Sequence, residues 1–165
     1  RGHLAEPMVV EIGDGALLML TRNTTGYLHQ SLSRDQGETW EAERATTLRS
    51  PCAPFCVKRD PFSGYLFVVW DQGSPGYPMH QFPRSPICLG VSRDGAKTWE
   101  FMCELDNDMF KSYGYPAIHF HQDALIITYY ESATRTFKPN EHRLKIRVIA
   151  RDELRVRRET FEALF

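Results

Sequence analysis

The chain has 165 residues, of which 42% are hydrophobic and 12% aromatic, so it can bury a sizeable core within a single domain. Its formal net charge is −1 and charges of both signs are interspersed, which argues against the basic stripe typical of nucleic-acid binding. No apolar run approaches the roughly 20 residues needed to cross a bilayer, so neither nucleic acid nor membrane is an expected partner.

Short alternating or apolar runs bounded by turn residues predict strands along most of the chain. The first group comprises Met8–Ile12, Ala16–Arg22, Tyr27–Ser33 and Glu41–Thr47. The second group comprises Phe55–Lys58, Tyr65–Asp71, Ile87–Ser92 and Glu100–Leu105, with a long Gly/Pro loop from Gly73 to Pro86. The third group comprises Ala117–Phe120, Leu125–Glu131 and Leu144–Arg151. The charged tail from Glu153 to Phe165 is typical of a helix or of a distorted outer strand.

One motif recurs within this pattern. The residues S-R-D-Q-G-E-T-W at 33–40 return 59 positions later, imperfectly, as S-R-D-G-A-K-T-W at 92–99. Each copy ends one predicted strand and opens another, so the chain is built from copies of one supersecondary unit. Asp and Ser side chains bond backbone N–H groups in tight turns, Gly adopts positive φ, and Trp supplies an apolar anchor. The motif therefore predicts a turn that joins adjacent strands and carries no catalytic meaning by itself.

This spelling resembles the Asp-box of the sialidase (neuraminidase) superfamily, which joins the outer strands of propeller blades. The first copy matches at all five signature positions, whereas in the second the glycine is one place early, at Gly95. The resemblance implies an all-β fold of three four-stranded antiparallel blades, at approximately 4–49, 50–110 and 111–165. Because sialidase propellers have six blades, the chain would form half a ring, namely the C-terminal half. Either it is a fragment of a longer protein, or two copies associate; the fragment is favoured.

Four polar residues near the expected blade centres follow the sialidase order, namely Glu6, Arg22, Arg84 and Tyr115. Their contexts, E-P at 6–7, R-S-P-I at 84–87 and Y-G-Y-P at 113–116, are similar to a bacterial branch of that superfamily. The resemblance implies that Arg22 and Arg84 bind the sialoside carboxylate, which guanidinium groups hold bidentately. Tyr115 would be the nucleophile, because that carboxylate repels an anionic one, and Glu6 would be its general base.

Several neighbouring residues keep two interpretations. Tyr113 shares its strand with Tyr115 and, by simple alternation, the same face, so it is a substrate contact, an alternative nucleophile or a core aromatic. Asp71 either lines the cleft beside Arg84 or caps a turn. The strand that ends in Tyr129, Tyr130 and Glu131 is a candidate for the pocket rim, and the sequence does not select one of the three.

No metal or cofactor is expected. His119 and His121 are two apart on a strand, but no third ligand accompanies them, so an exposed strand face is the favoured interpretation. Cys52, Cys56, Cys88 and Cys103 contain no C-x-x-C pair, and buried free thiols are favoured over a disulfide framework.

The function implied by the resemblance is a sialidase-like exo-glycosidase that hydrolyses terminal sialic acid or a related acidic sugar. The family's third clamp arginine and its acid/base aspartate belong to earlier blades, so we expect this chain alone to be inactive or nearly so. The alternative is a non-catalytic Asp-box propeller that binds carbohydrate or protein. The resemblance favours a secreted or periplasmic protein.

Overall fold

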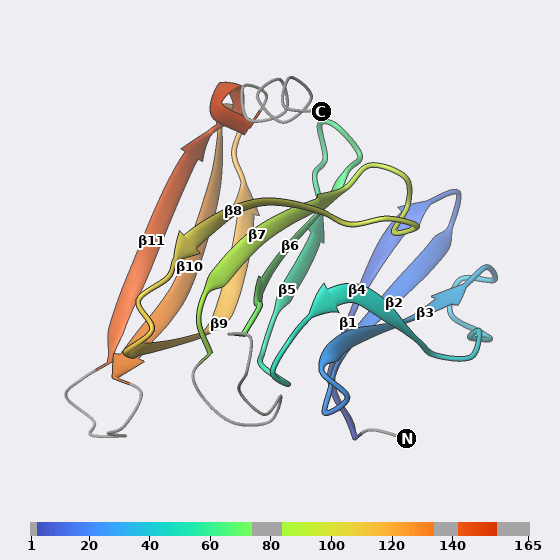
Figure 1. Cartoon of the computed structure of the whole chain (residues 1–165). Helices are drawn as coiled ribbons and strands as arrows, with labels where there is room; N and C mark the ends of the chain where they lie inside the picture. The colour runs from blue at the N-terminus through green and yellow to red at the C-terminus, as the bar shows by residue number, and fades with distance from the viewer. Residues whose placement is uncertain (1–2, 74–83, 134–141, 155–165) are drawn as a thin grey trace, which may run out of the picture.

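The computed structural model describes residues 3–73, 84–133 and 142–154, and within them eleven strands form three antiparallel sheets (Figure 1). The first sheet contains β1 (Leu4–Gly13), β2 (Ala16–Asn23), β3 (Tyr27–Ser33) and β4 (Arg44–Arg49). The second contains β5 (Cys56–Arg59), β6 (Leu66–Asp71), β7 (Ile87–Ser92) and β8 (Glu100–Asp106). The third contains β9 (Lys111–Phe120), β10 (Ala124–Ala133) and β11 (Arg143–Ala150).

Each sheet is a simple meander in which consecutive strands pair, and the three sheets lie side by side as blades of a partial propeller (Figure 1). The first strands of the sheets are neighbours, because β5 contacts both β1 and β9. The all-β, three-sheet fold predicted from the sequence is confirmed. The third sheet has three strands among the described residues, and the tail predicted to complete it lies largely outside them; Arg151 to Leu154 form one helical turn.

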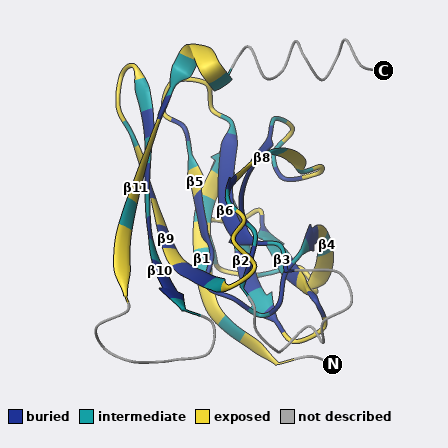
Figure 2. Ribbon diagram, turned by 60° about the vertical axis from the view of Figure 1, so that its left-hand side comes forward, coloured by how far each residue is buried: buried dark blue, intermediate teal, exposed yellow. Residues whose placement is uncertain are grey.

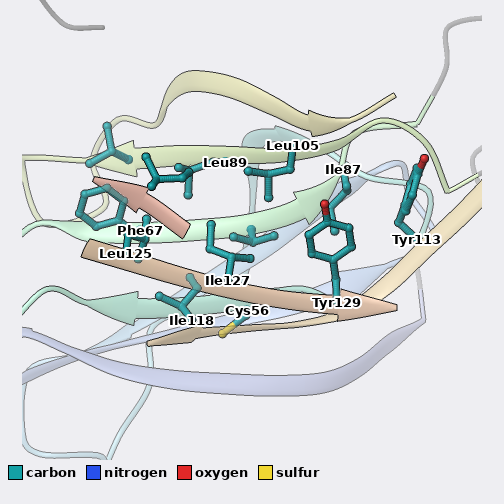
Figure 3. Close-up of a cluster of buried hydrophobic side chains, with 13 residues drawn as sticks. Cys56, Phe67, Ile87, Leu89, Leu105, Tyr113, Ile118, Leu125, Ile127 and Tyr129 are labelled. Atoms are coloured by element: carbon teal, nitrogen blue, oxygen red, sulfur yellow. The ribbon is translucent and has the colours of Figure 1, made fainter. Parts of the chain in front are cut away.

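Two hydrophobic cores hold the sheets together, and β6 contributes to both. Its six residues are all buried, because the second sheet is covered on both faces. Val68 and Trp70 pack toward the first sheet against Leu18 and Leu20. Side chains of the opposite face form the second core, shown in Figure 3, which includes Phe67, Val69, Leu89, Ile127 and Tyr129. By contrast, β11 exposes most of its residues (Figure 2).

The two copies of the repeated motif form turns that share their Ser, Asp and Thr hydrogen bonds, whereas among the described residues the indole N–H donates to a turn carbonyl only in the first copy, from Trp40 to Gly37. In the first turn, Asp35 accepts bonds from the Thr39 backbone N (2.9 Å) and Oγ1 (2.5 Å), and Gly37 N donates to Ser33 Oγ (2.8 Å). The bonds from Thr39 lower the pKa of Asp35 to about 2. In the second turn, Asp94 accepts the equivalent bonds from Thr98 at 3.0 and 2.6 Å. The repeat is therefore a structural unit that joins β3 to β4 and β7 to β8.

The displaced glycine of the second copy has a conformational explanation. Each turn requires two consecutive residues with positive φ, which are Gln36 (61°) and Gly37 (98°) in the first copy. In the second copy they are Gly95 (71°) and Ala96 (67°). Glycine adopts this conformation without a Cβ penalty, so it can occupy either position and relieve part of the strain. The second copy thus keeps the backbone of the first although its spelling differs.

No helix among the described residues is both long and apolar enough to cross a membrane.

Candidate functional site

The antiparallel order divides the sheets into two edges. The site edge, at the bottom of Figure 1, contains the starts of β1, β5 and β9 and the ends of β2, β6 and β10. The turn edge, at the opposite side, contains the β1–β2, β5–β6 and β9–β10 connections and both motif turns. All six residues predicted for the site lie at the site edge: Glu6, Arg22, Asp71, Arg84, Tyr113 and Tyr115.

Glu6 and Tyr115 occupy equivalent irregularities of the first and third sheets. Their φ angles are 49° and 48°, and each lies at a register shift, between Ala5 and Met8 in β1 and opposite the Thr128/Tyr130 step of β10. Positive φ is unfavourable for residues with a Cβ and is concentrated at functional sites. Cys52 also has positive φ, at 57°, but it lies before β5 and outside the strand pairing. Each sheet therefore has a non-glycine residue with positive φ near the start of its first strand.

The irregularity at Tyr115 corrects one prediction from the sequence. Simple alternation predicts that Tyr113 and Tyr115 share a face, but Tyr113 is 1% exposed and Tyr115 is 61% exposed. Tyr115 has a left-handed backbone and lies at a shift of register. This bulge interrupts the alternation of side chains along β9, so the two tyrosines no longer point to the same face. Tyr115 is thus presented to solvent at the site edge, and Tyr113 is directed into the core.

Tyr113 packs edge-to-face against Tyr129 with ring centroids 6.0 Å apart. Burial, reinforced by the negative charge of Asp106, raises the pKa of Tyr113 to about 12. This environment is that of a core aromatic, one of the interpretations that the sequence left open. The substrate-binding role of Tyr113 stays a prediction that its burial does not support.

Glu6 and Arg22 are in direct contact across the first two strands. Arg22 Nη2 lies 2.9 Å from Glu6 Oε1, with the arginine side chain 20% exposed and the glutamate side chain 45% exposed. The Arg22 Nε atom is buried and has no hydrogen-bond partner within the described part of the chain. The guanidinium is therefore fixed on one side by Glu6.

A second group surrounds Arg84. Asp71 is fully buried and its two carboxylate oxygens have no hydrogen-bond partner among the described residues. Burial raises the pKa of Asp71 well above its ordinary value, and the positive charge of Arg84 opposes that shift. Arg84 also forms a side-chain hydrogen bond with Tyr130. The structure thus brings Asp71, Arg84 and Tyr130 together, with Asp71 behind the exposed surface.

Tyr115 belongs to this second group through its ring, which stacks on that of Tyr130 with centroids 5.6 Å apart and planes at 29°. The structure consequently joins the predicted residues in two groups, Glu6 with Arg22 and Arg84 with Asp71, Tyr130 and Tyr115. A direct contact between Glu6 and Tyr115, as base and nucleophile, stays a prediction. The sequence left Tyr130 as one of three candidates for the pocket rim. The strand register, which pairs Tyr130 with Gly114 and so places it beside Tyr115, cannot be derived from the residue pattern.

No three His, Cys, Asp or Glu side chains converge in a metal-binding arrangement in the part of the chain that the structure describes. Cys56 and Cys88 are buried free thiols, and Cys52 and Cys103 are partly buried free thiols. The burial expected for the cysteines from the sequence is found at Cys56 and Cys88, and only in part at Cys52 and Cys103.

The comparisons with known proteins agree with this architecture. Residues 2–127 match a family described as BNR repeat-like domain. Among solved structures, the α-L-arabinofuranosidase of Fusarium graminearum has a TM-score of 0.67 and 19% identity, over 88% of this chain and 45% of that chain. The Trypanosoma rangeli sialidase has a TM-score of 0.72 and 16% identity, over 96% of this chain and 25% of that chain.

The intramolecular trans-sialidase of Ruminococcus gnavus has a TM-score of 0.61 and 21% identity, over 91% of this chain and 33% of that chain. The comparison with curated proteins gave no match. The chain spans less than half the length of these structural neighbours, and identities of this size show the fold alone. From its family match and its three adjacent antiparallel sheets, the chain belongs to the BNR repeat-like domain family and has a sialidase-like propeller fold.

Proposed function

We propose that this chain carries part of a glycosidase active site for an acidic sugar of the sialoside type. In this proposal Tyr115 is the nucleophile, Glu6 is its general base, and Arg22 and Arg84 bind the sugar carboxylate. The observation that supports it most is the meeting of these residues, from four separate strands or loops, at one edge of the sheets. Glu6 and Tyr115 are held there by matching left-handed irregularities, and such strain persists where the fold has a use for it.

The two arginines suit recognition of a carboxylate. Arg22 is held by Glu6, and Arg84 by Asp71 and Tyr130, so little side-chain freedom remains to be lost when a ligand binds. Guanidinium groups keep their charge at all physiological pH values and offer paired N–H donors. In the proposal, these two groups fix the sugar so that its anomeric carbon faces the Tyr115 hydroxyl.

The proposed chemical step uses the exposed phenol of Tyr115. Its oxygen attacks the anomeric carbon while Glu6 accepts the phenolic proton, and the bond to the leaving oxygen breaks. That leaving oxygen needs a proton from an acid, which the proposal assigns, with a third arginine, to a further blade. The division into blades at 4–49, 50–110 and 111–165 is part of the same proposal.

The exposed side of the third sheet supports a further blade. Leu144, Ile146 and Val148 alternate along β11 and are 73%, 60% and 65% exposed, whereas the opposite face of the sheet packs on the second sheet. Exposed apolar patches of this kind mark interaction surfaces. We propose that another antiparallel sheet of the same propeller covers them. Self-association of the purified chain, measured by native mass spectrometry, would instead favour the pairing of two copies.

A binding propeller without catalysis is the second candidate. The observation that favours it is the stacked pair of Tyr115 and Tyr130. The Tyr115 ring is exposed and offers a platform for a sugar face. Such a platform needs neither a nucleophile nor a base. The two candidates differ in whether Tyr115 forms a bond to the sugar.

Binding can be tested by NMR titration of the chain with N-acetylneuraminic acid, its methyl ester and arabinobiose. We expect the acid to bind, and the uncharged ester to bind about tenfold or more weakly, because it loses charge-assisted hydrogen bonds. Arg84→Gln should weaken binding of the acid by a similar factor. Arg34→Gln is the control, because Arg34 is exposed at the turn edge. Equal binding of acid and ester, or preference for arabinobiose, would contradict the acidic-sugar assignment.

Catalysis can be tested with 2,3-difluorosialic acid. Fluoride leaves without protonation, so this probe examines the nucleophile without the acid that protonates a leaving sugar oxygen. We expect mass spectrometry to find a covalent adduct on Tyr115, and Tyr115→Phe to abolish it. Binding of the acid without any adduct would favour the non-catalytic propeller.

A further inference from the structure

We infer that Tyr130 is a positioning residue that fixes both the Arg84 guanidinium and the Tyr115 ring. The inference rests on the proposed function, in which these two groups bind the sugar carboxylate and attack the anomeric carbon. Tyr130 contacts both of them, through its hydroxyl and its ring respectively.

The position of the Tyr130 ring is closely defined. It stacks on Tyr115, and the ring of His142 meets it edge-on at a centroid distance of 6.0 Å. Beneath it lies Gly114, where a Cβ would be 3.3 Å from both Cζ and Oη of Tyr130. A residue larger than glycine at 114 would force the ring to move. The glycine in the Y-G-Y-P segment is therefore explained by the close approach of Tyr130.

The hydroxyl end of Tyr130 meets charged groups. Arg84 forms a hydrogen bond with it, and the buried Asp71 carboxyl acts on both Arg84 and Tyr130. Burial raises the pKa of Tyr130, while the positive charge of Arg84 opposes the rise and the Asp71 charge adds to it. The three groups consequently form one electrostatic unit, and Tyr130 is its only member that also touches Tyr115 among the contacts described above.

This arrangement gives Tyr130 a specific consequence. A change in the Arg84 position moves the Tyr130 hydroxyl, and a change in the Tyr130 ring moves the stacked ring of Tyr115. The carboxylate-binding group and the proposed nucleophile are thus held in one geometry by a residue that neither binds nor attacks the sugar.

The first experiment needs no ligand and follows the ring carbons of the tyrosines by NMR during a pH titration. Arg84→Gln should raise the titration midpoint of Tyr130, because the opposing positive charge is lost. Asp71→Asn should lower it. Tyr130→Leu and Gly114→Ala should both shift the ring signals of Tyr115, whereas Tyr27→Phe, a control in β3, should leave them unchanged. Unchanged Tyr130 midpoints and unchanged Tyr115 signals in these folded variants would overturn the inference.

The second experiment measures sugar binding and separates the two hypotheses. Tyr130→Phe keeps the stack but removes the hydroxyl, so it should weaken binding of N-acetylneuraminic acid about tenfold. It should leave binding of the methyl ester nearly unchanged. Suppose that the unmodified chain binds no acidic sugar, but that the variants of the first experiment change the Tyr130 midpoint and the Tyr115 signals as expected. The proposed function then fails and the positioning role stands. If the unmodified chain binds the acid in an Arg84-dependent manner but Tyr130→Phe has no effect, the positioning role fails instead.

Discussion

The site edge and the turn edge of the same three sheets differ in how well their backbone and polar groups are satisfied. At the site edge, Glu6, Cys52 and Tyr115 have positive φ near the starts of the first strands. Among the described residues, most of those with buried unpartnered polar atoms lie at the same edge, namely Arg22, Asn23, Ser50, Asp71 and Ser112, and one, Trp99, lies beside the second motif turn. This edge therefore carries both backbone strain and unsatisfied polar groups.

At the turn edge, most polar groups and positive-φ residues are stabilised by hydrogen bonds, with Trp99 Nε1 as the exception among the described residues. The positive-φ residues of this edge lie within hydrogen-bonded tight turns, including both motif turns. The buried Asp60 accepts two bonds from Arg151 at 2.9 Å and one from Ser63 Oγ at 2.6 Å, which ties the second sheet to the end of the third. Arg151 also lies over the ring of Phe62, 4.4 Å from its centroid. The comparison teaches that stabilising contacts and proposed functional groups are placed at opposite edges of the strands.

The largest effect that would test this contrast is expected at Asp60. Asp60→Ala removes the partner of a half-buried arginine and three side-chain hydrogen bonds, so it should lower the free energy of unfolding by about 3 kcal/mol. Tyr115→Phe at the site edge should change it by less than about 0.5 kcal/mol, because Tyr115 is exposed. Urea denaturation measures both, with the exposed Asp152→Ala as control. Equal losses for Asp60→Ala and Tyr115→Phe would remove the distinction between the edges.

A second test uses pH, because the two buried aspartates shift in opposite directions. Burial alone would raise the pKa of Asp60, but the hydrogen bonds from Arg151 and Ser63 lower it from 3.8 to about 2. The contribution of this pKa shift to the free energy of unfolding, about 1 to 2 kcal/mol, should be complete above about pH 4 and be lost as the pH falls toward 2. Burial raises the pKa of Asp71, so the native state binds more protons than the unfolded state above pH 4. Stability should therefore decrease as the pH rises through the Asp71 titration.

The measurement is the free energy of unfolding in urea as a function of pH. Asp71→Asn should remove the decrease above pH 4, and Asp60→Asn should flatten the loss below it. A profile above pH 4 that is the same in Asp71→Asn and in the unmodified chain would show that the buried carboxyl does not cost stability.

The smallest expected effect concerns backbone strain at the site edge. Cys52→Gly removes the Cβ from a residue with φ of 57° and so relieves strain in the native state. Glycine also increases the conformational entropy of the unfolded chain, which offsets part of this gain. The net result should be a free energy of unfolding that is higher by about 0.5 kcal/mol. Gln36→Gly, at φ of 61° in the first motif turn, is the matched variant at the turn edge. Thermal unfolding compares the two, and a destabilised Cys52→Gly would indicate that the thiol contributes packing that outweighs the strain.

The strands were predictable from sequence because their pattern is local. All eleven were expected, and Tyr27–Ser33 and Ile87–Ser92 have the predicted bounds. The starts of β1 and β9 were expected too late, at Met8 and Ala117, and in each strand a proline, Pro7 or Pro116, lies directly before the expected start. The proline follows a left-handed residue in each case, and pairing resumes on both sides of the irregularity. Alternation of side chains fails at such points, which is why Tyr113 and Tyr115 were placed on one face.

The site was predictable only in part, for a different reason. The order of Glu6, Arg22, Arg84 and Tyr115 along the chain identifies candidates, but contacts between them depend on register and on side-chain packing. The pairing of Glu6 with Arg22, and the position of Tyr130 over Gly114, follow from bulges that the residue pattern does not encode.

The exchange of glycine between the two left-handed positions of the motif turns affects how such repeats are detected. A search pattern that demands glycine in one fixed column penalises the segment at 92–99, although its backbone and its aspartate bonds match those at 33–40. A description based on dihedral angles and on the Ser, Asp and Thr contacts would accept both. Divergent blades of this architecture should then be easier to find in distant sequences.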